Sequence, residues 1–133
     1  MTRAAPARRH GEILTITEIL VRTTAISSTP QPLSVRVLGT LIAYDSNNSL
    51  ALIEYGKARL VVDTALLGPF RHRLRTLLQF IGDVECDWRP PNRVSFDPPN
   101  VGVVVRARIV RNVEGLDVRL YEQAMKLRLE FGV

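Results

Sequence analysis

The sequence predicts an all-β fold with flanking helices, in which a small barrel of five strands is followed by a C-terminal α-helix. Five apolar, β-rich segments follow one another between turn residues. A short helical segment interrupts them after the third strand. The last strand leads into an amphipathic stretch that reaches Phe131. In this order the elements are typical of the OB-fold, a five-stranded Greek-key barrel.

The barrel strands are predicted from apolar runs bounded by Gly, Asn, Ser, Asp and Pro. They are expected at 34–45, 50–54, 58–63, 76–84 and 101–111. Gly39 and Gly82 lie in the middle of their strands, where glycine indicates a bulge or a sharp bend. One or two helical turns are expected at 64–70, capped by Asp63 or Thr64.

Side-chain alternation then predicts which strand residues fill the barrel, because neighbouring residues of a strand point to opposite faces. The residues expected inside are Val35, Val37, Leu50, Leu52, Leu60, Val62, Val103, Val105, Ala107 and Ile109. Arg59, Arg106 and Arg108 are expected on the outer face.

The chain of 133 residues has room for one compact domain, expected at 12–133 with the C-terminal helix included. A basic, disordered tail is expected at 1–11, although its arginines also loosely fit a mitochondrial presequence. A short apolar element at 15–21 and a loop at 23–32 precede the barrel. The single cysteine, Cys86, cannot form an internal disulfide, which favours an intracellular, reducing compartment. No apolar run approaches the roughly 20 residues of a membrane span.

The C-terminal helix is predicted to have two apolar stripes on nearly opposite sides, at 3.6 residues per turn. One stripe consists of Leu120, Ala124, Leu127 and Phe131. The other consists of Val118, Met125 and Leu129. One stripe can cover the protein's own core. Because a soluble monomer rarely exposes a contiguous apolar strip, the other stripe predicts an interface with another chain. A loosely buried terminal helix is the alternative.

No pattern of catalytic residues is found, so the sequence predicts a protein that is not an enzyme and has no cofactor. The two histidines, His10 and His72, and Cys86 do not have the spacing of zinc ligands. Gly-rich phosphate loops and the common hydrolase motifs are missing from the sequence.

The net charge of +5 and three basic patches point to an anionic partner such as nucleic acid. The loop that begins at Cys86 combines rings and cations, since Trp88 and Phe96 can stack on bases while Arg89 and Arg93 contact phosphates. The alternative is that both rings fold back as a lid on the barrel. A second patch is the segment 70–75. The third lies on the strand face and consists of Arg36, Tyr55, Lys57 and Arg59.

Several strings, among them SVRVLGTLIAYD, LVVDTALLGPF, LLQFIGDVE and NVEGLDVRLYEQA, together resemble the Ten-one family, the smallest subunit of the CST telomere complex. The match covers 34–131. The resemblance implies a nuclear OB-fold protein at the telomeric region of chromosomes. It further implies a heterodimer with the middle-sized CST subunit, association with the large CST subunit, protection of telomeric single-stranded DNA, and support of DNA polymerase α–primase in fill-in synthesis.

The resemblance also assigns the face of Val118, Met125 and Leu129 to the partner, with Tyr121 and Phe131 as interface aromatics. The proline-rich loop after Cys86 is longer than is usual in the family, and the basic tail often found after the helix is missing. Three alternatives stay open: the smallest subunit of replication protein A, a pure assembly scaffold without nucleic-acid contact, and an RNA-binding OB module of the translation apparatus.

Overall fold

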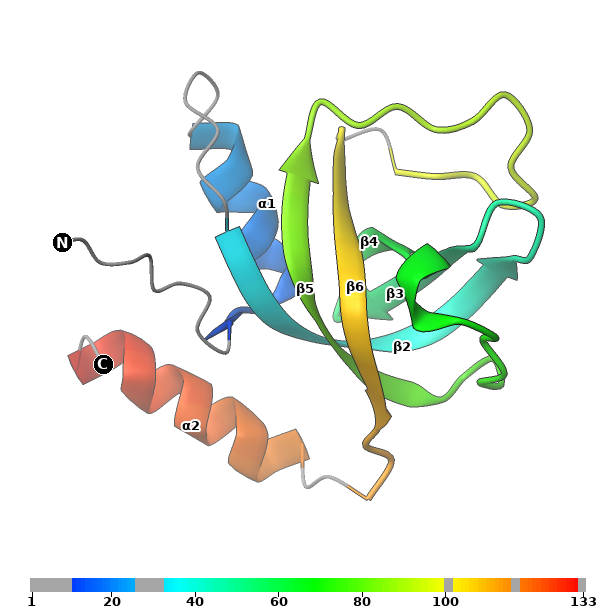
Figure 1. Ribbon diagram of the computed structural model, residues 1–133. Helices are drawn as coiled ribbons and strands as arrows, with labels where there is room; N and C mark the ends of the chain where they lie inside the picture. Colours follow the sequence, from blue (N-terminus) through cyan, green and yellow to red (C-terminus); the bar gives the residue numbers. More distant parts are fainter. Residues whose placement is uncertain (1–10, 26–32, 100–101, 116–117, 132–133) are drawn as a thin grey trace, which may run out of the picture.

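The computed structural model describes residues 11–25, 33–99, 102–115 and 118–131 (Figure 1). The side chains at 24, 25, 118 and 128–131 are outside this description. The predicted basic tail, up to residue 10, and most of the predicted loop at 23–32 also lie outside the described residues.

Within the described residues, five strands close into a barrel and one short strand extends its sheet. The strands are β1 (Glu12–Ile13), β2 (Leu33–Asp45), β3 (Leu50–Tyr55), β4 (Ala58–Asp63), β5 (Leu77–Cys86) and β6 (Val103–Asn112). Their order is β1-β2-β3-β4-β6-β5, and β2 closes the barrel by pairing with β5. The β4–β6 pair is parallel, whereas the other barrel pairs are antiparallel. This arrangement confirms the predicted OB-fold.

Strand β2 is long enough to serve both sides of the barrel. Its first part, 33–40, pairs with β5, and its last part, 40–45, pairs with β3. The register shift lies between Leu41 and Ala43, so Ile42 is the extra residue. Of the bulge or sharp bend expected at Gly39, the bulge therefore lies further along the strand. Gly39 instead permits close packing, because a Cβ atom there would lie 2.9 Å from the Cβ of Ile53.

The barrel interior differs from the prediction in two strands. Ala51 and Ile53 of β3 point inside, whereas Leu50 and Leu52 belong to a cluster on the outer face. Alternation could not decide this, since 50–53 is apolar at every position. In β6, a register shift between Ala107 and Ile109 reverses the alternation. Ile109 is therefore 45% exposed, and Val110 packs against the interior.

Helix α1 (Ile16–Ala25) contributes buried side chains to the barrel core, in a region where the sequence predicted only a short element and a loop from residue 23. A reciprocal capping box begins the helix: the Thr15 amide donates to Glu18 Oε1 at 2.9 Å, and the Glu18 amide donates to Thr15 Oγ1 at 3.0 Å. Ile16 and Ile19 are fully buried. The Thr-x-x-Glu spacing was the signal that the sequence interpretation missed.

Two further elements complete the fold: the short 3₁₀ helix η1 (Ala65–Leu67) after β4, and the terminal helix α2 (Val118–Phe131). The structure thus confirms a helical turn within the predicted 64–70 segment. In Figure 1, α2 and the long β5–β6 connection lie at opposite ends of the molecule. The partner surface and the loop surface predicted from sequence are therefore separate.

Candidate partner and nucleic-acid surfaces

Helix α2 has a buried side chain on one face and exposed apolar side chains on another. Met125 is only 7% exposed, whereas Leu120 and Leu127 are 62% and 54% exposed. Leu120 and Leu127 are seven residues apart, which places them on one side of the helix, with the exposed Ala124 between them.

This orientation is the reverse of the one that the family resemblance implies. The stripe expected to cover the core is exposed at Leu120 and Leu127, and the stripe assigned to a partner is buried at Met125. Val118, Leu129 and Phe131 were also predicted at the interface, but their side chains lie outside the described residues. Tyr121 is half-buried. Periodicity identifies two stripes, but the rotation of the helix depends on what it packs against.

A hydrogen bond joins α2 to the barrel. The Tyr55 hydroxyl, at the end of β3, donates to Glu122 Oε2 at 2.5 Å. Partial burial, together with the bond to this carboxylate, raises the pKa of Tyr55 well above its usual value. Tyr55 was predicted to contact nucleic acid; the structure uses its polar end to join the barrel to α2.

The connection between β5 and β6 folds onto the outer face of the barrel. Leu50, Leu52, Val61 and Val104 form an apolar cluster there, and the side chains packed against it include Trp88, Val94 and Phe96. Trp88 and Phe96 therefore fold back onto the barrel, as the alternative interpretation of this loop expected. Both residues stay partly exposed.

Asp45 ties this loop to the β2–β3 turn. Its carboxylate accepts hydrogen bonds from the Asn48 side chain at 2.9 Å, from the Ser95 amide at 3.0 Å and from the Asn47 amide at 3.0 Å. The Asn48 side chain also donates to the Arg93 carbonyl at 2.8 Å. These hydrogen bonds lower the pKa of Asp45, and the bond from the Asn48 side chain has the largest effect.

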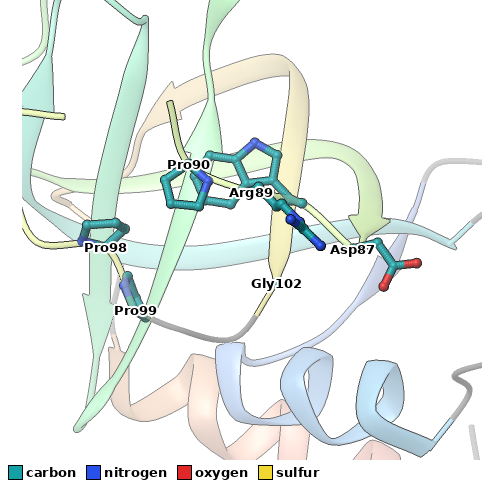
Figure 2. A pocket seen from close by; sticks show the side chains of 7 residues that line it. Asp87, Arg89, Pro90, Pro98, Pro99 and Gly102 are labelled. Atoms are coloured by element: carbon teal, nitrogen blue, oxygen red, sulfur yellow. The ribbon is translucent and has the colours of Figure 1, made fainter. Parts of the chain in front are cut away.

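Trp88 also lines an open pocket of about 670 Å³ between the two limbs of the loop (Figure 2). Pro90 stands on one limb and Pro98 and Pro99 on the other, with the carboxylate of Asp87 turned away from the prolines. Arg89 lines the same pocket and is exposed. The sequence predicted both Trp88 and Arg89 as nucleic-acid contacts, and the structure places both in the wall of this pocket.

The third predicted patch is divided between two parts of the barrel. Arg36 lies opposite Ile13 of β1 and Ile81 of β5. Lys57 is exposed in the β3–β4 turn, and Arg59 forms an ion pair with Glu54 at 3.0 Å. With Tyr55 bound to α2, the four residues do not form one strand-binding face.

The outward arginines of β6 are neutralised by neighbouring carboxylates. Arg106 forms ion pairs with Glu85 at 2.9 Å and with Asp63 at 3.8 Å. Arg108 lies 2.7 Å from Asp83. This face of the barrel is therefore a ladder of ion pairs and attracts an anion only weakly.

The segment 70–75 contains exposed arginines and begins with a phenylalanine that packs on the barrel. Phe70 stacks on Tyr44 with ring centroids 4.6 Å apart, which fixes the start of the segment on the barrel. Arg71, Arg73 and Arg75 are exposed. Arg75 further lines a second pocket together with Arg59 and Phe96, which the sequence had placed in three different patches.

Two negative findings concern the described part of the chain. Neither of its helices has the length and apolar character needed to cross a membrane. Among the same residues, His, Cys, Asp and Glu side chains do not gather in a group of three or more that could hold a metal ion.

A closed barrel in OB order, with an added terminal helix, defines an OB-fold protein. The model of the family described as "Telomere-capping, CST complex subunit" matches residues 7–132, and the chain belongs to this family. This finding sets aside the smallest subunit of replication protein A and the translation module. The chain is 29% identical to the CST complex subunit TEN1 of Arabidopsis thaliana over 98 residues, or 74% of this chain and 69% of that protein.

Two solved structures share the fold. The first, from the crystal structure of the S. pombe Stn1-ten1 complex, has a TM-score of 0.65 at 14% identity and covers 93% of this chain and 96% of that chain. The second, the S. pombe telomere capping protein Ten1, has a TM-score of 0.61 at 16% identity, with 90% of this chain and 98% of that chain covered.

Proposed function

We propose that this telomere-capping subunit acts by binding and not by catalysis, and that it pairs with the middle-sized OB-fold subunit of CST through the exposed stripe of α2. The observation that carries the proposal is the pair of exposed leucines, Leu120 and Leu127, on a helix whose opposite face is already buried at Met125. The description of an S. pombe structural neighbour as an Stn1-ten1 complex supports it. By helical spacing Phe131 belongs to the same stripe.

Within the assembly, the proposed role is to help the large CST subunit protect telomeric single-stranded DNA in the nucleus and to support DNA polymerase α–primase in fill-in synthesis. The net charge of +5 and the exposed arginines at 71, 73 and 89 support a contact with the DNA backbone. The competing function, a pure scaffold, is favoured by the ion pairs of Arg106 and Arg108, which neutralise part of the barrel surface.

The pairing is tested by co-expressing the chain with the middle-sized CST subunit of the same organism and measuring recovery in a pull-down. Leu120→Glu and Leu127→Glu each place a charge in the proposed interface, and each is expected to weaken association by at least ~2 kcal/mol, or about 30-fold. Gln123→Glu is the matched control, because Gln123 is an exposed residue of the same helix.

Undiminished recovery of both leucine variants, with folding unchanged by circular dichroism, would contradict the proposed interface. The DNA role is tested separately by fluorescence anisotropy of the recovered heterodimer with a single-stranded oligonucleotide. Binding that weakens with salt supports a strand contact. A heterodimer whose affinity equals that of the middle-sized subunit alone would favour the scaffold.

A further inference from the structure

A second pocket, of about 360 Å³, opens where the β5–β6 loop meets the outer face of β3 and β4. An apolar side chain of the barrel, Leu52, and the ring of Phe96 form part of its wall. The charged residues at this pocket are Glu54, Arg59, Arg75 and Asp97. Its volume falls in the range of about 300 to 1,000 Å³ that is usual for small-ligand sites.

We propose that this pocket binds one unpaired nucleotide of a DNA strand, with the base against the ring of Phe96 and its phosphate on the guanidinium of Arg75. The proposal rests on the strand-binding part of the proposed function and names the residues that carry it. A pocket that combines a flat ring with arginines offers the two interactions by which strand-binding proteins hold a nucleotide.

The ring of Phe96 is held in position by its neighbours. The Ser95 amide donates to the buried carboxylate of Asp45 at 3.0 Å, so the backbone next to Phe96 is fixed to the β2–β3 turn. One part of the ring packs on the outer apolar cluster, and the residue stays partly exposed. A ring that is already ordered loses little conformational entropy when a base stacks on it.

Arg75 occupies a strained backbone position. Its φ of 76° lies in the left-handed region, which favours glycine. The Arg75 amide donates to the Leu41 carbonyl at 2.7 Å and the Leu41 amide donates to the Thr76 carbonyl at 2.9 Å, so the fold imposes this conformation. Strained residues cluster at ligand sites. Arg75 also forms no ion pair with a described residue, unlike Arg59.

The carboxylates of Glu54 and Asp97 bear on which base the pocket accepts. They can accept hydrogen bonds from the exocyclic amino group of a base, as Asp and Glu do from cytosine N4. The combined chemistry fits a nucleotide whose base has an amino group better than it fits thymine.

The test uses the full chain and labelled oligo(dC) and oligo(dT) of about 12 nucleotides, within the ~4–16 that one OB-fold covers. Phe96→Leu keeps an apolar side chain without a ring and is expected to weaken oligo(dC) binding about 5-fold or more. Arg75→Gly relieves the backbone strain, so the melting temperature is expected to stay the same or rise. It should reduce the slope of log affinity against log salt by about 0.7.

Arg111→Ala is the control, since Arg111 is exposed on β6 and does not line the pocket. Stronger binding of oligo(dC) than of oligo(dT), with the difference reduced in Asp97→Ala, supports the base contact. Loss of binding together with a lower melting temperature in Arg75→Gly, repeated in Arg75→Asn, would assign Arg75 a structural role and overturn the proposal.

The test also separates the two levels of the proposal. If the wild-type chain binds and the pocket variants bind equally well, this site is wrong and the proposed function stands. If neither the chain nor its heterodimer binds either oligonucleotide, the site and the strand-binding function both fail, while pairing through α2 is unaffected.

Discussion

Truncating one apolar side chain on each face of α2 tests the orientation of this helix directly. Full burial of a methionine side chain stabilises a protein by about 1.5–3 kcal/mol, and Met→Ala substitutions in cores cost about 2–5 kcal/mol. Met125 is 7% exposed, but it lies on a peripheral helix that can settle into the space left behind. We therefore expect Met125→Ala to cost about 2 kcal/mol, at the low end of the range.

Leu127→Ala is the matched control, because it also shortens an apolar side chain of α2. Leu127 is 54% exposed in the isolated chain, so its truncation is expected to change stability by less than about 0.5 kcal/mol. Both substitutions bring in alanine, so helix propensity changes little and similarly in the two.

The measurement is native-state hydrogen exchange of the α2 backbone amides, since α2 can open without unfolding of the barrel. A loss of 2 kcal/mol corresponds to about 30-fold faster exchange in Met125→Ala. Equal acceleration in the two variants, or a larger effect of Leu127→Ala, would refute the orientation and return the partner interface to the Met125 face.

Two more predictions concern the β5–β6 loop. Trp88→Ala is expected to destabilise the chain by about 1–3 kcal/mol in urea unfolding, which is less than the loss of a fully buried ring would cost. It is also expected to weaken strand binding by about 1–3 kcal/mol if the ring stacks on a base. Unchanged binding in fluorescence anisotropy would leave packing as the only role of Trp88. Asp45 has a lowered pKa in the folded state, so its contribution is present at neutral pH and lost as the pH falls through that pKa. The difference in melting temperature between wild type and Asp45→Asn should therefore shrink below about pH 4, and a constant difference would contradict this reasoning.

Local patterns predicted most of the barrel but not the phase of every strand. The strand positions followed from apolar runs and turn residues, and the interior positions of β4 and most of β6 followed from alternation. The errors at Leu52 and Ile109 have separate causes. At Leu52 both faces of β3 are apolar, because the loop covers its outer face. At Ile109 a bulge reverses the alternation, and a bulge depends on how β6 pairs with β5.

The candidate sites were predicted as residue types and not as arrangements. The sequence predicted Trp88, Arg89 and Arg59 as nucleic-acid contacts, and the structure places them in two separate pockets. Arg75 is placed next to Arg59 and Phe96 by the fold, although the three come from distant parts of the chain. No spacing rule brings such residues together, because their contact depends on how the loop folds onto β3 and β4.

The sequence by itself determined the OB-type barrel, the presence of a terminal helix with two apolar stripes, and the family, because these depend on local periodicity and on motifs in order along the chain. Only the tertiary structure decided which stripe stays exposed. The reason is physical: Met125 and Leu127 have similar hydrophobicity, and which of them is buried depends on the rotation of α2, which the bond between Tyr55 and Glu122 helps to hold.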